Sequence, residues 1–277
     1  MTSKTALVAG GTGGVGLSIV RALVKNNYNV FFIGTNKHKG LRIESELKKN
    51  YNTKICFVAL DLSDLRSVKK YAVDFSEQND QLDLLVNVAG VVLPKRQETQ
   101  DGLEKTFAIG YLSAFILSVE LTSLLEKSAH PRILNVSGGA ALALKGRLNF
   151  NDLNFSKKYN GFLAAAKTVH AKTVLAEILS EKLLDKKIDV NAFHPGIVVS
   201  GLARNMAWPL RWLVKTAFVF LPKDSKTGVR ACISDSLNGV TGQYLVDKNQ
   251  IPLQFEKPYK EKLWQETEKI LTGVYTR

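Results

Sequence analysis

The chain has 277 residues, a length that suits one large α/β domain better than two small ones. Apolar residues make up 45% and charged residues 23% of it, as in ordinary soluble proteins, and the two cysteines, Cys56 and Cys232, provide neither a disulfide framework nor zinc ligands. The net charge of +13 comes from lysines scattered among acids, which indicates a solvated surface without a nucleic-acid-binding motif and leaves a weak pull toward anionic membranes open.

Short apolar runs alternate with helix-length segments along the chain. The predicted strands are Thr5–Ala9, Asn29–Gly34, Lys54–Ala59, Leu82–Asn87, Arg132–Ser137, Asp189–His194 and a seventh at Gly242–Val246. The predicted helices are Gly14–Asn26, Lys39–Asn50, Leu65–Gln78, Gly102–Lys127 and Gly161–Leu184. Such alternation is typical of a doubly wound parallel sheet with helices on both faces. We therefore predict a single α/β domain over residues 1–277 with about seven strands.

The N-terminus leads directly into the first predicted strand. Met1–Lys4 leaves no room for a signal peptide, and no segment is long and uninterrupted enough to predict a transmembrane span. The expected location is therefore the cytoplasm.

A glycine-rich segment follows the first predicted strand and opens the first helix. Glycines allow a tight turn and a close approach of the backbone to a pyrophosphate, which lies at a helix N-terminus where amide donors favour anions. The required strand-before, helix-after context is present. The segment therefore predicts a dinucleotide site that includes Gly10, Thr12, Gly14, Val15 and Gly16.

The spacing of Gly10, Gly14 and Gly16 resembles that of the short-chain dehydrogenase/reductase superfamily, and later segments match it in order. These are Asp61-Leu62, Asn87-Val88-Ala89-Gly90, Arg132–Ser137 and His194–Ser200. The segments that resemble the subgroup containing retinol dehydrogenases are Asp152–Phe155, Lys158-Tyr159, Thr241–Tyr244 and Lys262–Trp264. The resemblance implies a Rossmann-like fold. It also implies further cofactor-binding residues: Asp61, Leu62, Asn87, Ala89, Gly90, Pro195, Gly196 and Val198.

The end of the second predicted strand decides between NADP(H) and NAD(H). A carboxylate there would bind the adenosine ribose, whereas a cation would accept a 2′-phosphate. The segment Thr35-Asn36-Lys37-His38-Lys39 has no carboxylate, so Thr35 and Asn36 are expected to supply hydrogen bonds and Lys37 or Lys39 the charge. We expect NADP(H) rather than NAD(H); the alternative is that these lysines are only loop surface.

The resemblance also implies a proton-transfer site made of an Asn, a Ser and a Tyr four residues before a Lys. No Tyr-x-x-x-Lys occurs in this chain. Counting back without a gap from His194-Pro195-Gly196 puts Ala165 at the Tyr position and Val169 at the Lys position. The Ser and Asn positions fall on Gly138 and Gly110. We therefore predict no catalytic residues of the usual kind, and no metal site.

An alternative register puts Thr168 and Lys172 at the Tyr and Lys positions, at the cost of a three-residue insertion or deletion. Tyr111 is the best replacement phenol, and packing inside the protein is the alternative for it. His170 is expected to point away from the cleft, and His194 to be structural.

An apolar segment near residues 201–225 corresponds to the substrate lid of the family. It suggests a hydrophobic small molecule, a protein partner or a peripheral membrane contact, and the resemblance implies a homodimer or a larger assembly. Two hypotheses follow. The leading one is an NADP(H)-binding protein without the usual catalytic residues, acting as a sensor, a scaffold or an assembly subunit. The alternative is an NADPH-dependent oxidoreductase that acts on a hydrophobic carbonyl, iminium or enone by a non-standard mechanism.

Overall fold

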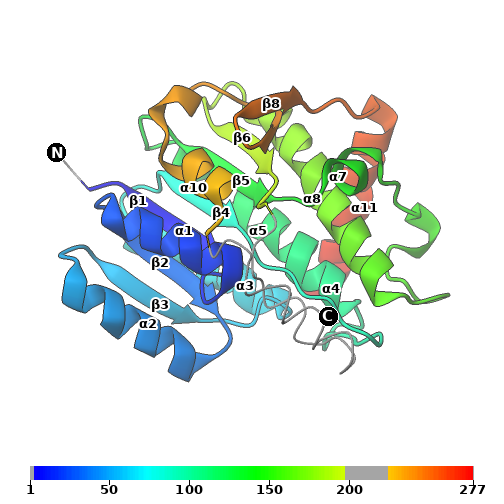
Figure 1. Cartoon of the computed structure of the whole chain (residues 1–277). Helices are drawn as coiled ribbons and strands as arrows, with labels where there is room; N and C mark the ends of the chain where they lie inside the picture. The colour runs from blue at the N-terminus through cyan, green and yellow to red at the C-terminus, as the bar shows by residue number, and fades with distance from the viewer. Residues whose placement is uncertain (1–2, 197–223, 277) are drawn as a thin grey trace, which may run out of the picture.

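The computed structural model describes residues 3–196 and 224–276, and their strands form one eight-stranded sheet (Figure 1). The strand order is β3-β2-β1-β4-β5-β6-β7-β8. Neighbouring strands from β3 to β7 pair in parallel, and β8 pairs with β7 in antiparallel. The bounds are β1 Thr5–Ala9, β2 Asn29–Gly34, β3 Ile55–Ala59, β4 Leu84–Asn87, β5 Arg132–Val136, β6 Asp189–Phe193, β7 Gln243–Val246 and β8 Asn249–Pro252.

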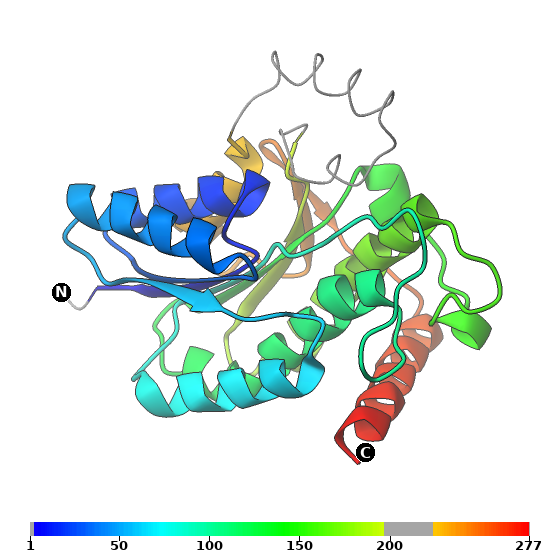
Figure 2. The same ribbon diagram turned by 90° about the horizontal axis from the view of Figure 1, so that it is seen from below.

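Helices cover both faces of this sheet, as Figure 2 shows. One face is covered by α1 (Gly14–Lys25), α2 (Lys37–Asn50) and α10 (Lys226–Ile233). The opposite face is covered by α3 (Leu65–Gln78), α5 (Ser113–Glu120), α8 (Gly161–Lys182) and α11 (Lys257–Tyr275). Shorter helices are α4 (Lys105–Phe107), α6 (Thr122–Leu125) and α7 (Ala140–Lys145), with 3₁₀ turns at Phe150–Asp152 and Asp235–Leu237. The prediction of a doubly wound parallel α/β fold is confirmed.

The central strands are apolar and buried, as expected for a parallel sheet covered on both faces. The helices that follow β2 and β3 begin at side-chain caps. Asn36 accepts a hydrogen bond from the backbone of Lys39, and Asp64 accepts one from the backbone of Ser67. Because the strands pair in parallel, the carboxyl ends of β1, β2, β4, β5 and β6 lie at one edge of the sheet, where ligands bind in this architecture.

The structure differs from the sequence prediction in several elements, among them the short helices α7 and α10, which were not predicted. The long helix predicted at Gly102–Lys127 is divided into α4, a π-helical turn at Ala108–Leu112, α5 and α6. The π-helical turn centres on Gly110, and such turns occur frequently at functional sites. The short exposed strand β8 and the helix α11 were not among the predicted elements.

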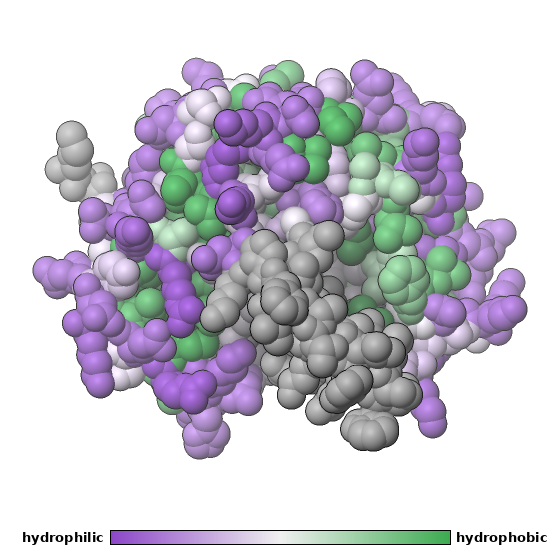
Figure 3. Space-filling model, in the orientation of Figure 1, coloured by the Kyte–Doolittle hydropathy of each residue, from purple (hydrophilic) through white to green (hydrophobic). Residues whose placement is uncertain are grey.

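On the face seen in Figure 3, the described residues are mostly hydrophilic, with smaller groups of apolar side chains between them. Within residues 3–196 and 224–276, none of the helices has the length and apolar character needed to cross a membrane. The same part of the chain holds no group of three or more His, Cys, Asp or Glu side chains arranged as metal ligands.

Candidate functional site

The glycine loop after β1 is pressed against the turn that follows β4. Gly10 has a φ of +94°, and a Cβ built on it would lie 2.8 Å from the backbone of Ala89. A Cβ on Gly16 would lie 2.1 Å from the carbonyl oxygen of Gly10. Gly14 has a φ of +51°, which also favours glycine. These contacts leave no space for side chains, so the loop backbone at the start of α1 is the exposed, amide-rich surface that a pyrophosphate needs.

Thr12 and Val15 support the loop from within. A Cβ on Gly34 would lie 2.4 Å from Thr12 Cγ2, so Thr12 packs over the end of β2. Val15 is buried in the core beneath the loop. The backbone N–H groups of Gly10 and Gly11 both donate to the carbonyl oxygen of Ile33, at 3.1 and 3.0 Å. Backbone hydrogen bonds and the packing of Thr12 therefore hold the loop to β2. The side chains of Thr12 and Val15 face the protein.

The end of β2 presents exposed polar residues beside this loop. Thr35, Asn36 and Lys37 are exposed. The Asn36 side-chain oxygen Oδ1 caps α2, since the backbone N–H of Lys39 donates to it at 2.9 Å. Lys39 Nζ lies 3.1 Å from the position of a Cβ on Gly13. Of the two candidate lysines, Lys39 is therefore the one that reaches the glycine loop.

The residues after β3 divide into one at the surface and one in the core. Asp61 is exposed, and its Oδ1 accepts hydrogen bonds from the backbone N–H and the hydroxyl of Ser63, at 2.9 and 2.8 Å. Leu62 is buried in the core with α3. Asp61 is thus oriented by its own turn at the rim of the sheet edge.

The turn after β4 is braced from below. The Asn87 side chain donates to Asn135 Oδ1 at 2.9 Å and to Ser118 Oγ at 3.2 Å, and it is buried. The backbone N–H of Ala89 donates to the carbonyl oxygen of Ala9 at 2.8 Å. Gly90 is exposed, with open space on its side-chain side. This turn forms a firm floor next to the glycine loop.

The segment after β6 is tied to α1 and α10. Ser225 Oγ donates to the carbonyl oxygen of Pro195 at 2.7 Å, and the Ser225 backbone N–H donates to Ser18 Oγ at 3.0 Å. Gly196 has a φ of +78°, and its N–H donates to His194 Nδ1 at 3.1 Å. Val198 and residues 201–223 of the predicted lid lie outside the described residues.

Two of the four positions predicted to lack chemistry, Gly138 and Val169, contact each other, and the other two, Ala165 and Gly110, lie on α8 and against it. Gly138 follows β5, and a Cβ on it would lie 3.1 Å from Val169 Cγ1. Ala165 lies one turn before Val169 on α8, and both are partly exposed. Gly110 lies against α8 too, because a Cβ on it would lie 2.4 Å from Thr168 Cγ2.

The alternative register places its residues inside the protein. Thr168 is buried, and its hydroxyl donates to the carbonyl oxygen of Ala164 at 2.8 Å. Lys172 is buried, and its Nζ lies 3.1 Å from the carbonyl oxygen of Ala89 and 3.4 Å from that of Asn87. Burial lowers the pKa of the Lys172 amine to about 7. Neither side chain faces the partly exposed side of α8 that carries Ala165 and Val169.

The candidate replacement groups point away from this face. The Tyr111 hydroxyl bonds with Thr267 Oγ1 at 2.8 Å, and burial raises the pKa of Tyr111 far above its usual value. His170 Nδ1 contacts the carbonyl oxygen of Ala143 at 2.8 Å and its Nε2 the Tyr259 hydroxyl at 3.0 Å. Burial lowers the pKa of His170. The expectation that His170 points elsewhere is confirmed, and Tyr111 packs inside the protein.

One phenol near the vacancies was not singled out from the sequence. The Tyr244 hydroxyl donates to the carbonyl oxygen of Gly138 at 2.6 Å. Tyr244 comes from β7 and is buried, and burial raises its pKa to about 12. The Ser137 hydroxyl pairs with Thr173 Oγ1 at 2.6 Å. Both contacts fix the backbone of the β5 turn and leave its exposed side without a hydroxyl.

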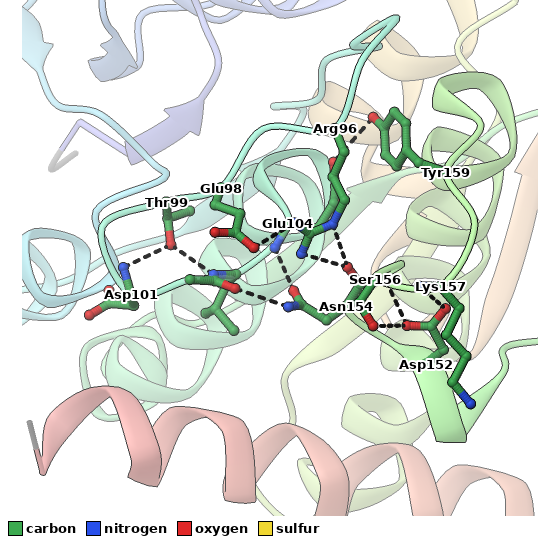
Figure 4. A network of polar contacts seen from close by, with 12 residues as sticks. Arg96, Glu98, Thr99, Asp101, Glu104, Asp152, Asn154, Ser156, Lys157 and Tyr159 are labelled. Carbon is green, nitrogen blue, oxygen red and sulfur yellow. Dashed lines mark hydrogen bonds and ion pairs between the residues drawn. The ribbon is translucent and has the colours of Figure 1, made fainter.

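A polar network anchors the start of α8 and of the π-helical turn (Figure 4). Arg96 donates to the carbonyl oxygen of Asn154 at 3.1 and 3.2 Å, and the backbone of Glu104 donates to Asn154 Oδ1 at 2.6 Å. Glu104 then caps α4 by accepting from the backbone of Phe107 at 2.7 Å. The Tyr159 hydroxyl donates to the carbonyl oxygen of Leu93 at 3.0 Å. The loops on either side of the site are thereby held together.

Comparison with known proteins agrees with this geometry. A model of the family described as short chain dehydrogenase matches residues 4–208, so the chain belongs to the short-chain dehydrogenase family of oxidoreductases. It is related to polyprenol and retinol dehydrogenases. It is 32% identical to polyprenol dehydrogenase of Danio rerio, over 95% of this chain and 85% of that protein. It is 28% identical to retinol dehydrogenase 14 of Mus musculus, over 99% of this chain and 87% of that protein.

Solved structures share the fold. The Pseudomonas aeruginosa RhlG/NADP complex matches with a TM-score of 0.61 at 24% identity, over 78% of this chain and 82% of that one. The family uses NAD(P)(H), so a nicotinamide dinucleotide is the expected ligand of the edge where the strands end.

Proposed function

We propose that this chain binds NADP(H) at the carboxyl ends of its strands and has lost the proton-transfer site of its family. It would act as a non-catalytic or repurposed member, in which nucleotide binding serves a sensor, a scaffold or an assembly. The observation that carries the proposal is the contact between Gly138 and Val169. In the register that we propose, Gly138 takes the family's Ser position and Val169 its Lys position, so the two positions carry a hydrogen atom and an isopropyl group; a Cβ on Gly138 would lie 3.1 Å from Val169 Cγ1.

The residues of the site fit a dinucleotide. The backbone cradle of Gly10, Gly14 and Gly16 would receive the pyrophosphate, because a Cβ at Gly10 or Gly16 would collide with backbone. Asp61 is oriented by Ser63 to accept a hydrogen bond from the adenine side. Lys39, with Thr35, would meet a 2′-phosphate beside Gly13, which favours NADP(H). The other proposed contacts are Thr12, Val15, Asn36, Lys37, Leu62, Asn87, Ala89, Gly90, Pro195, Gly196 and Val198.

A bound reduced nicotinamide would supply a hydride, but carbonyl reduction also needs a proton. A positioned general acid contributes roughly 10²–10⁴-fold in rate. Ala165 and Val169 cannot donate one, and Tyr111 and His170 are buried in contacts with Thr267 and Tyr259. The chain therefore holds a cofactor without the means of completing the usual reaction.

Residues 1–277 are proposed to form one domain, with the substrate lid near residues 201–225.

A second candidate function is an NADPH-dependent oxidoreductase with a hydrophobic substrate that needs no strong acid, such as an iminium or an enone. Two observations favour it. The relatives are named for the long apolar alcohols polyprenol and retinol. Large apolar side chains are exposed at the start of α8 and on α7, namely Phe162, Leu163 and Leu142. The same side chains would suit peripheral membrane contact.

Titration calorimetry with NADPH and NADH tests the proposal. Binding of NADPH at micromolar concentration, with NADH weaker, is the expected result. Failure of both dinucleotides to bind at millimolar concentration would exclude the cofactor site. Turnover of any carbonyl compound at ordinary enzymatic rates would exclude the loss of the proton-transfer site and favour the second candidate.

A further inference from the structure

Lys172 is a buried amine directly beneath the candidate cofactor site. It extends from the middle of α8 toward the end of β4, and only 2% of it is exposed. Its Nζ donates to the carbonyl oxygens of Ala89 at 3.1 Å and of Asn87 at 3.4 Å. Burying a charged amine without a carboxylate partner costs folding free energy. Lys172 donates only to main-chain oxygens, so its burial points to a role other than stability.

The turn that Lys172 contacts is the one that supports the glycine loop. Ala89 packs against Gly10, where a Cβ would lie 2.8 Å from its backbone, and its N–H donates to Ala9. The amine and the glycine loop therefore both contact Ala89, the amine at its carbonyl oxygen and the loop at its N and Cα. An ammonium there holds the turn in place and adds positive charge under a site that would receive two phosphate groups.

The groups around this amine are neutral. Asn87 from β4, Asn135 from β5 and Ser118 from α5 are linked to one another by hydrogen bonds. Asn135 also donates to the carbonyl oxygen of Lys172 at 3.2 Å. On α8 itself, Thr168 donates to its own helix and Thr173 pairs with Ser137.

The ionisable groups on neighbouring elements face elsewhere. From the π-helical turn, Tyr111 contacts Thr267 on α11. On α8, His170 contacts Tyr259, and Glu177 pairs with Lys260 of α11 at 2.7 Å. Burial is thus what lowers the pKa of the Lys172 amine, and none of these ionisable groups pairs with it.

We infer that Lys172 is a positioning residue that couples dinucleotide binding to proton uptake, by holding the Asn87–Ala89 turn and becoming fully charged when the anionic nucleotide binds. The inference rests on the proposed function, because it requires a dinucleotide in the cleft. The one bond made is the N–H bond on Lys172 Nζ, formed with a proton that solvent or buffer gives up, and no other bond changes.

The test is calorimetric titration of the full-length chain with NADPH near pH 7, in buffers of different ionisation enthalpy. The variants are Lys172→Met, which removes the amine, and Lys172→Arg, which keeps a charge at all pH values. Lys167→Met is the matched control, because Lys167 is on the same helix and lies over the Phe155 ring at 5.7 Å. Comparison between proteins cancels protons taken up or released by the nucleotide itself.

The wild type and Lys167→Met are expected to take up a fraction of a proton more than either Lys172 variant. Lys172→Met should bind NADPH about tenfold more weakly, as expected for a lost charged donor, whereas Lys172→Arg should keep most of the affinity. Equal affinity and equal proton uptake in the wild type and Lys172→Met would overturn the inference while leaving the cofactor site intact. Absence of NADPH binding by the wild type would contradict the proposed function itself.

Discussion

Gly110 and Thr168 are packed so closely that each limits what the other can be. A Cβ on Gly110 would lie 2.4 Å from Thr168 Cγ2. That methyl group cannot swing away freely, because the Thr168 hydroxyl donates to the carbonyl oxygen of Ala164 at 2.8 Å. The position that we assign to the family's Asn is therefore also closed to a larger side chain by its neighbour Thr168.

Replacing Gly110 with Asn should destabilise the protein by about 1–3 kcal/mol, the usual cost of overpacking a core. Adding Thr168→Ser, which removes only the obstructing methyl group, should recover most of that loss. Chemical denaturation of both single variants and the double variant measures the coupling. Gly273→Asn, in open space on α11, is the control and should change stability little. If the effects of Gly110→Asn and Thr168→Ser on the free energy of unfolding were additive, the contact between these two positions would not limit the side chain at position 110.

Adding a side chain to the tightly packed glycine loop should abolish nucleotide binding. Gly16→Ala places a methyl group 2.1 Å from the Gly10 carbonyl oxygen, so the loop must move to accept it. We expect no NADPH binding at concentrations that saturate the wild type, measured by calorimetry on protein whose fold is checked by circular dichroism. Gly273→Ala should bind normally and be more stable by about 1 kcal/mol, because alanine favours a helix interior. Normal NADPH affinity in Gly16→Ala would place the nucleotide elsewhere.

Lys39 should carry the preference for NADP(H). Its Nζ lies beside Gly13, whereas Lys37 is exposed in the first turn of α2. Lys39→Ala should weaken NADPH binding about tenfold, the usual effect of losing one charged hydrogen bond, and leave NADH affinity nearly unchanged. Lys37→Ala is the matched variant and should have a smaller effect. An equal loss of affinity for NADPH and for NADH in Lys39→Ala would mean that Lys39 does not recognise the 2′-phosphate.

The sequence was enough to predict the parallel sheet, because buried apolar strands and capped helices alternate clearly. It could not predict β8, whose four residues are all exposed and carry no apolar pattern. The break at Ala108–Leu112 was missed because a π-helical turn leaves the surrounding residues helical and apolar. Tyr111 and Lys172 could not be oriented from spacing, since their partners, Thr267 and Ala89, are remote in sequence.

The buried Lys172 should make stability depend on pH. Its pKa is lowered from 10.5 to about 7 by burial, so the unfolded chain binds more protons between these values. Stability should therefore rise with pH above about 7, by up to about 1.4 kcal/mol per pH unit, and Lys172→Met should lose this contribution. Urea denaturation of both proteins at pH 7, 8 and 9 measures the difference. If the free energy of unfolding changed with pH in the same way for the wild type and Lys172→Met, the Lys172 amine would be solvated and would keep its ordinary pKa.

Restoring two of the four side chains should not restore activity. Ala165→Tyr with Val169→Lys supplies the phenol and the amine, but Gly138 and Gly110 still provide no hydroxyl or amide side chain. We expect NADPH oxidation with retinal and other apolar aldehydes to stay at the background rate. Adding Gly138→Ser, Gly110→Asn and Thr168→Ser is the fuller reconstruction. Measurable carbonyl reduction by the double variant alone would contradict the assignment of these positions.

The central claim is that the wild-type chain holds NADP(H) without completing the family's reaction. Incubating saturating protein with NADPH deuterated at the transferring carbon, and with a panel of apolar aldehydes, ketones and enones, tests it most directly. Mass spectrometry of the products is predicted to find no deuterium above the level without protein, although NADPH is bound. Stereospecific deuterium transfer into any product would contradict the claim.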